Sequence, residues 1–200
     1  MPVRLLFVVI IAFAVGSLAA VLMRPAAMAP QMQKAAIGGP FALTNQDGKR
    51  MTDQDFRGKY LLVTFGYTAC PDVCPAELQT MANAMDQLGD KAERVNPVFI
   101  TIDPERDNVG QVADYVKNFH QRFVGLTGTA DEIKQAARAY RVFYAKSEQK
   151  NSALGYLMDH SAFIYLMNPQ GEYVTHFSYS TPAEKIAAAV EKAMVSGGQS

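Results

Sequence analysis

Two unbroken apolar runs on either side of an amphipathic segment constrain the fold of this chain more than any other feature. Residues 60–65 (YLLVTF) and residues 97–102 (PVFITI) are rich in β-branched and aromatic side chains. Such runs are typical of strands that are covered on both faces of a sheet. Between them, apolar side chains at helical spacing over residues 78–88 end at Gly89. The pattern predicts a βαβ unit with two central strands.

The segments before and after this unit continue the alternation of strands and helices. Residues 41–44 and 50–52, joined by a turn that contains NQDG, predict a hairpin ahead of the unit. After the unit, an apolar stripe at helical spacing over residues 112–119 predicts a second helix, and residues 123–126 predict a short strand. Thr129 opens a Thr-x-x-Glu capping box, which predicts the start of a third helix.

The C-terminal part predicts further strands and a last helix. Residues 142–145 form a short apolar segment that is followed by a polar loop. Residues 161–167 and 173–177, joined by the turn NPQG, predict a hairpin. A second capping box at Thr181, with Pro182 at the first helical position, predicts the C-terminal helix. The order βαβ followed by ββα predicts an α/β fold of the thioredoxin-like sandwich type, with the N-terminal hairpin added to it.

Length and charge limit the classes of function. A chain of 200 residues that is 49% hydrophobic and 19% charged can bury one core and carry an appendage, and this composition excludes disorder over most of its length. Nineteen basic side chains are balanced by 19 acidic ones. The chain therefore has no excess of positive charge to hold a phosphate backbone, and we expect no nucleic-acid partner.

An apolar run near the start predicts a membrane anchor over residues 1–24. Residues 5–23 contain no charged side chain and lie between Arg4 and Arg24. As a helix, this run would be about 28 Å long, close to the thickness of a bilayer core. A signal peptide is the alternative, because residues 17–19 (SLA) are similar to a small-x-small cleavage site. The length of the run favours an uncleaved, single-pass helix.

The segment after the apolar run predicts a tether. Residues 25–37 mix Pro, Ala, Met and Gln without an apolar period, which is typical of a linker. The folded domain is then expected over residues 38–200. No Arg- and Ser-rich stretch precedes the apolar run, which argues against a mitochondrial transit peptide. We therefore expect a protein of the bacterial inner membrane.

The chain has two cysteines, and they lie close together between a strand and a helix. Cys70 and Cys74 follow the strand at residues 60–65, at the sheet edge where open α/β folds bind ligands. Pro75 predicts that Cys74 lies near the helix N-cap, where the helix dipole lowers the pKa of its thiol. A thiolate serves both disulfide exchange and metal binding. Three intervening residues, against two in thioredoxin-type motifs, allow either a disulfide or two sulfur ligands on one ion.

Two thiolates need a further ligand to hold a metal ion, and the chain has three histidines. His120 is expected to be solvated at a helix end, and His176 to lie half-exposed in an edge hairpin. His160 directly precedes the strand that lies opposite the cysteine loop in a thioredoxin-like sheet, and it would complete a set of two sulfurs and one nitrogen that suits Cu(I). A structural His160 bonded to its own loop is the alternative. Zinc would require a fourth ligand, for which Asp159 and Asp72 are weak candidates.

Four segments together resemble the SCO/SenC family. They are residues 64–78 (TFGYTACPDVCPAEL), 102–107 (IDPERD), 125–128 (GLTG) and 159–161 (DHS), and the similarity extends from about residue 38 to about residue 177. The resemblance implies a membrane-tethered copper chaperone with a thioredoxin-like fold, whose domain faces the periplasm in bacteria. It also implies one copper ion, Cu(I) or Cu(II), held by Cys70, Cys74 and His160.

The resemblance implies partners and a second possible function as well. The expected acceptor is the copper A centre of cytochrome c oxidase subunit II, with other periplasmic copper donors or thioredoxin-like reductants as further partners. The alternative to a chaperone is a thiol-disulfide reductase that uses the redox-capable pair Cys70 and Cys74 to keep the copper-receiving cysteines of the oxidase reduced. We expect a chaperone that is not an enzyme.

The loop at residues 103–107 (DPERD) follows a strand at the same edge as the cysteines. In the SCO/SenC family this loop is linked to organisation of the metal site and to partner contact. We therefore expect Asp103 and Tyr67 to support the site and to lie in a docking surface around it. A solvated turn stiffened by Pro104 is the alternative.

Overall fold

The structure, a computed structural model, describes residues 37–148 and 155–197. The chain divides into two units, residues 1–35 and 36–200, and the description concerns the second. The predicted anchor at residues 1–24 and nearly all of the predicted linker lie outside the described residues. In the described part of the chain, no helix is long and apolar enough to cross a membrane.

The predicted βαβ unit forms the centre of the fold. Strands β3 (Tyr60–Gly66) and β4 (Val95–Thr101) pair in parallel along their whole length. All seven residues of β3 are buried, as the unbroken apolar run predicts. Helix α2 (Val73–Leu88) connects the two strands and ends where Gly89 takes a positive φ of 52°.

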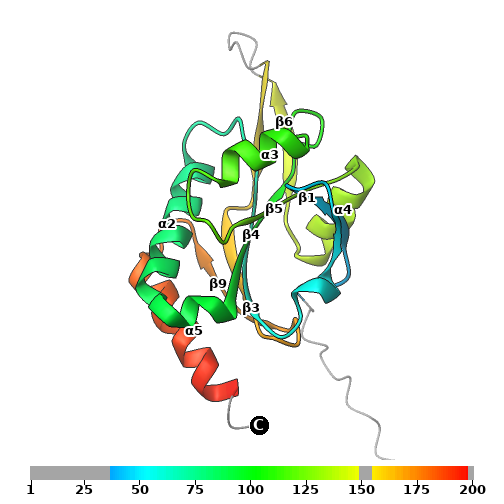
Figure 1. Cartoon of the computed structure of the whole chain (residues 1–200). Coiled ribbons are helices and arrows are strands. Elements are labelled where there is room, and N and C mark those ends of the chain that lie inside the picture. The colour runs from blue at the N-terminus through cyan, green and yellow to red at the C-terminus, as the bar shows by residue number, and fades with distance from the viewer. Residues whose placement is uncertain (1–36, 149–154, 198–200) are drawn as a thin grey trace, which may run out of the picture. The chain divides into compact units, whose positions relative to one another are not determined.

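The unit is extended into a sheet of seven strands in the order β2-β1-β5-β4-β3-β8-β9 (Figure 1). Strands β3, β4 and β5 are parallel, and the predicted hairpins at both ends of the chain add antiparallel strands. The other five strands have these bounds: β1 (Ala42–Asn45), β2 (Arg50–Thr52), β5 (Val124–Thr127), β8 (Phe163–Met167) and β9 (Tyr173–Ser178).

Helices cover both faces of this sheet, so the domain has two cores. One core joins the sheet to α2, α3 and α5, and the other joins it to α4. Neighbouring residues of β3 point to opposite faces, so Leu62 packs in the first core and Val63 in the second. The remaining helical elements have these bounds: η1 (Asp53–Phe56), η2 (Gly89–Arg94), α3 (Val109–Val116), α4 (Ala130–Ala139) and α5 (Ala183–Gly197).

Helix boundaries follow the capping signals with small differences. Thr129 caps α4, because its side chain accepts from the backbone N–H of Glu132, as the capping box predicts. Helix α5 begins one residue after Pro182, which was expected at its first position. Helix α3 ends at Val116, so the predicted stripe out to Phe119 continues into turns, where the Phe119 ring still packs against the core.

One element was missed from the sequence. Strands β6 (Tyr144–Glu148) and β7 (Tyr156–His160) form a separate two-stranded antiparallel sheet, where a short strand and a polar loop were expected. Lys146, Glu148 and Asp159 expose their side chains, because the hairpin projects from the body of the domain (Figure 1). Only part of this hairpin packs against a core, and its exposed polar residues hide it from a search for apolar patterns.

Candidate metal centre

The two cysteines lie at the junction of β3 and α2, as predicted. Cys70 belongs to the connecting loop and is partly exposed, whereas Cys74 lies in the first turn of α2 and is 1% exposed. The N-cap of α2 is Asp72, so Cys74 lies two residues into the helix and close to the N-cap, as predicted. The consequence concerns the other sulfur: the backbone N–H of Cys74 points at Cys70 Sγ, 3.4 Å away. The positive end of the helix therefore faces Cys70.

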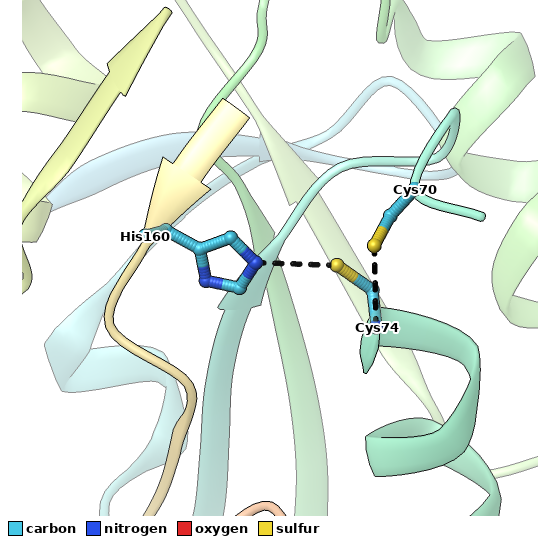
Figure 2. Close-up of side chains that lie close together, drawn as sticks. All are labelled: Cys70, Cys74 and His160. Carbon is cyan, nitrogen blue, oxygen red and sulfur yellow. Dashed lines mark hydrogen bonds between the residues drawn. The ribbon is translucent and has the colours of Figure 1, made fainter. Parts of the chain in front are cut away.

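His160 is the last residue of β7 and faces the cysteines (Figure 2). Its Nε2 lies 3.4 Å from Cys74 Sγ, and its Nδ1 lies 3.1 Å from the carbonyl oxygen of Ser161. A carbonyl can only accept, so Nδ1 carries a hydrogen and donates it to Ser161. In the neutral ring, Nε2 then has a free lone pair that points toward the sulfurs. This is the arrangement that orients histidines for metal binding.

The three side chains bring one nitrogen and two sulfurs together. Cys70 Sγ, Cys74 Sγ and the His160 ring nitrogen all lie within 4.8 Å of one another. Among the described residues, no other set of three histidine, cysteine or carboxylate side chains is as close. Asp72 and Asp159, the weak candidates for a fourth ligand, are exposed and do not belong to this group. The structure therefore brings together Cys70, Cys74 and His160 and leaves both carboxylates out.

The other two histidines lie elsewhere. His120 follows α3, accepts from the backbone N–H of Arg122 and lies 3.7 Å from Asp86. Its side chain is only 15% exposed, so the expectation of a solvated residue is wrong: the turn after α3 folds it against the end of α2. His176 is exposed on the edge strand β9, close to the half-exposed position that was expected.

The two sulfurs differ in acidity. A hydrogen bond from the Cys74 thiol lowers the pKa of Cys70 to about 3, burial opposes this shift, and the contact with His160 supports it. The same hydrogen bond and burial raise the pKa of Cys74. The sequence predicts a lowered pKa for Cys74, and this is wrong because Cys74 holds the shared proton. Burial by itself lowers the pKa of His160, but the contacts with Cys70 and Ser161 outweigh it and the net shift is upward.

In the reduced, metal-free protein we expect Cys70 to react as a thiolate across the neutral range. Its rate of alkylation by iodoacetamide should change little between about pH 5 and pH 9, because its pKa lies near 3. An ordinary thiol becomes about tenfold faster per pH unit below a pKa of about 8.5. The measurement is mass spectrometry of the labelled peptide, with the unfolded protein as the control. A rate that rises steadily through this range would contradict the assignment.

A buried carboxyl group lies beneath the site and was missed from the sequence. Glu77 is 0% exposed, and its Oε2 accepts from the hydroxyl of Thr64 at 3.2 Å. Burial raises the pKa of Glu77 to about 7, so the group is neutral in mildly acidic solution and adds no full negative charge beside the two sulfurs. The signal was present in the sequence, because Glu77 is four residues before Met81 on the buried face of α2.

The loop at residues 103–107 connects to the hairpin that ends in His160. Asp103 is 1% exposed, pairs with Arg106 and accepts from the hydroxyl of Tyr156 at 2.8 Å. The guanidinium of Arg106 lies 3.7 Å from the centre of the Tyr156 ring. Tyr156 begins β7 and His160 ends it, so these contacts fix the strand that carries the imidazole.

Tyr67 and Asp103, which were expected in a docking surface, do not lie on the surface of the domain. Both side chains are buried, at 2% and 1% exposure, and the rings of Tyr67 and His160 form a T-shaped pair at a centroid distance of 6.1 Å. These two side chains can therefore support the site only through contacts inside the domain. Asp107 was not singled out from the sequence, yet it accepts from the backbone N–H of Thr68 at 2.9 Å and from the Thr101 hydroxyl at 2.6 Å. It ties the cysteine loop to β4.

Comparison with known proteins agrees with this geometry. A family model described as SCO1/SenC matches residues 29–195. The Arabidopsis thaliana protein named SCO1 homolog 1, mitochondrial, is 46% identical over 164 residues, which cover 82% of this chain and 48% of the relative. The chain spans about half the length of the curated relatives it matches.

Solved structures show the same fold. A crystal structure of Arabidopsis thaliana ScoI with copper bound has 45% sequence identity and a TM-score of 0.76, covering 80% of this chain and 99% of that one. A structure of BsSco, described as having a disulfide switch and as a member of the Sco family of cytochrome c oxidase assembly proteins, has 26% identity and a TM-score of 0.64, covering 79% and 93%. The predicted thioredoxin-like sandwich is confirmed, and the chain belongs to the SCO1/SenC family.

Proposed function

We propose that this protein binds one copper ion through Cys70, Cys74 and His160 and carries it as cargo. The observation that carries the proposal is the convergence of two sulfurs and one imidazole nitrogen within 4.8 Å. Two soft thiolates with one imidazole suit Cu(I), whereas zinc would require a fourth ligand, and no carboxylate of the described residues belongs to the group. Two thiolates balance the charge of Cu(II) and leave only one negative charge with Cu(I), so neither form leaves a large buried charge.

The cargo is proposed to go to the copper A centre of cytochrome c oxidase subunit II. Family membership and the copper-bound relative support a role in assembling this oxidase. The expected apolar helix at residues 1–24 would tether the domain to the bacterial inner membrane, with the domain in the periplasm. Residues 25–37 would then be the linker and residues 38–200 the copper-binding domain. Periplasmic copper donors and thioredoxin-like reductants are proposed as further partners.

Release is proposed to proceed by stepwise ligand exchange with partner thiolates. Cys70 and His160 are partly exposed, whereas Cys74 is buried, so an incoming thiolate reaches the ion from the side of the first two. Phe143 is 65% exposed, and its backbone pairs with Ser161 beside His160. An exposed aromatic ring at the base of the hairpin that carries His160 is suited to contact a partner during transfer. It takes the place of the surface that was expected at Tyr67 and Asp103.

The test of the proposal is the composition of the copper site. The reduced full-length protein, loaded with Cu(I) and freed of excess metal, should retain one copper per chain. X-ray absorption at the copper edge should show two sulfur scatterers and one nitrogen scatterer. A protein that retains no copper, or a site without sulfur, would refute it.

Copper binding should also depend on a glycine that leaves room for Cys74. A Cβ on Gly66 would lie 2.9 Å from Cys74 Sγ and 3.1 Å from a ring carbon of Phe99. We expect Gly66→Ala to lower the free energy of unfolding by about 1–3 kcal/mol and to weaken copper binding, because the sulfur must move. Denaturant titration and competition with a Cu(I) chelator measure the two effects.

The matched control for Gly66 is another crowded glycine. A Cβ on Gly125 would overlap Val112 and Val116 and none of the three ligands. Gly125→Ala should therefore destabilise the fold and leave the copper affinity of the folded protein unchanged. Equal losses of copper affinity in the two variants would show that Gly66 acts only through stability.

A thiol-disulfide reductase is the second candidate, favoured by the unequal acidity of the two sulfurs. The Cys70 thiolate would attack a partner disulfide, forming a mixed disulfide and releasing one partner thiolate. Cys74, once deprotonated, would then attack Cys70 Sγ, releasing the second partner thiolate and forming the Cys70–Cys74 disulfide. The two electrons come from the cysteine pair, and a thioredoxin-like reductant would restore it.

A further inference from the structure

Two neighbouring hollows lie at the pole of the domain opposite the cysteines. The larger one, of about 610 Å³, lies between the β8–β9 turn, β9 and the C-terminal part of α5, with Tyr60 in its wall. The smaller one, of about 380 Å³, lies on the other side of α5. Tyr60 begins β3, and the cysteine loop follows its end, so about 20 Å of strand separates these hollows from the metal site.

Two cations lie between the hollows. Arg94, at the end of η2, and Lys192, on α5, line both of them. In the described part of the chain neither side chain forms an ion pair, whereas the nearby Lys91 is neutralised by Glu191 at 2.6 Å. Arg94 and Lys192 therefore leave positive charge for an anion at the point where the hollows meet.

Apolar side chains lie on either side of this pair of cations. Val174 in the larger hollow is 41% exposed, and Val195 in the smaller one is 67% exposed. They are two of the four large hydrophobic side chains that the described residues leave exposed. Exposed apolar groups that surround charged ones mark a binding surface for an amphiphile. The accessible surface of both hollows is mainly apolar, although the ion pair of Lys91 and Glu191 also lines the smaller one. Two such hollows that share one cationic edge match a ligand with one anionic group and two apolar chains.

The folded domain also begins at this pole. A Cβ on Gly38 would touch the end of the Met167 side chain and lie 3.8 Å from the carbonyl oxygen of Gly171, so Gly38 lies against the β8–β9 turn. The same turn contributes residues 168–170 to the larger hollow, and the C-terminal end of α5 lies nearby (Figure 1). The membrane anchor of the proposed function would keep the domain close to a bilayer, which would supply such a ligand. That step rests on the proposed function.

We propose that this pole binds one anionic diacyl phospholipid, with its phosphate between Arg94 and Lys192 and one acyl chain in each hollow. Such binding would orient the domain, because the cysteines and His160 lie at the other end of β3 and would point away from the membrane. The metal site would then be open to a partner.

The test uses the full chain in phosphatidylcholine nanodiscs that contain a minor fraction of phosphatidylglycerol with photoreactive acyl chains. After irradiation, we expect cross-links within residues 168–175 and 188–195, two segments that contain most of the residues lining the hollows. Arg94→Ala/Lys192→Ala should reduce labelling about tenfold, because both charges that hold the phosphate are lost. Lys185→Ala removes a cation from the same helix outside the hollows and should leave labelling unchanged.

Three further arms separate the alternatives. Ala189→Phe should block labelling at residues 168–175 by filling the larger hollow with both cations intact. Dodecyl phosphate should compete with the lipid, whereas inorganic phosphate should not. Equal labelling by photoreactive phosphatidylcholine, equal competition by inorganic phosphate, or no cross-link at these residues would overturn the proposal. Copper stoichiometry, measured in every variant, should stay unchanged, so failure here is distinct from failure of the copper site.

Discussion

Replacing both cysteines with serine should reduce the copper content of the protein from one ion per chain to none. Serine keeps the size of the side chain but offers a neutral, hard hydroxyl in place of a soft thiolate, and His160 alone cannot hold Cu(I). The Cys70→Ser/Cys74→Ser variant is loaded with Cu(I), freed of excess metal and measured by elemental analysis. This is the largest effect that the structure predicts, because both sulfur ligands come from one loop and helix turn.

A loss of copper is evidence that the sulfurs bind the ion only if the variant is folded. Cys74 is 1% exposed, so a serine at this position buries a hydroxyl group at a cost of about 1–3 kcal/mol. Circular dichroism and denaturant titration establish the folded fraction, and Cys70→Ser alone provides a milder variant because Cys70 is partly exposed. A folded double variant that still carries one copper ion would show that the site lies elsewhere.

Replacing His160 with alanine should separate copper binding from disulfide exchange. We expect the affinity for Cu(I) to fall more than about 100-fold, since losing a group that merely orients a ligand already costs about 10- to 100-fold. Cys70 and Cys74 remain in the variant, and disulfide exchange needs only the two sulfurs. The rate of reduction of a model disulfide should therefore stay within a few-fold of the wild-type rate.

The control for this variant is His176→Ala, which removes an exposed imidazole from the edge strand β9. It should leave both measurements unchanged. If His160→Ala keeps full copper affinity, the imidazole is structural, as the bond from its Nδ1 to Ser161 would allow. If it loses disulfide exchange together with copper, the two roles share His160 and the reductase does not act through the cysteines alone.

The centre of the fold could be predicted because its strands are buried on both faces. The apolar runs at residues 60–65 and 97–102 are typical of strands that are covered on both faces, and they form most of β3 and β4. The hairpin β6–β7 could not be predicted, because Lys146 and Asp159 on its strands point into solvent and break the apolar pattern. The element that carries His160 was therefore predicted as a loop.

The three side chains proposed as ligands could be found from the sequence, but their protonation states could not. Cys70, Cys74 and His160 follow from residue type and from position in an α/β fold. Which sulfur is the thiolate depends mainly on the hydrogen bond that places the shared proton on Cys74, with burial of Cys74 and the contact between Cys70 and His160 acting in the same direction. The burial of Asp103 likewise depends on Tyr156, which is 53 residues away in the chain. Contacts of this kind form only when the chain has folded.

The proposed ligands belong to segments connected to two different sheets, which would give a bound copper ion a mechanical role. Cys74 follows the seven-stranded sheet and His160 ends the two-stranded one, 86 residues apart in the chain. A bound ion would act as a removable cross-link that closes this long loop, in the way a disulfide does. Loading would stabilise the fold by about 2.7 kcal/mol at a free copper concentration of 100 times Kd. Transfer of the ion would remove this cross-link from the hairpin, so the copper-free protein would be less stable. The melting temperature would therefore show whether a molecule still carries its copper.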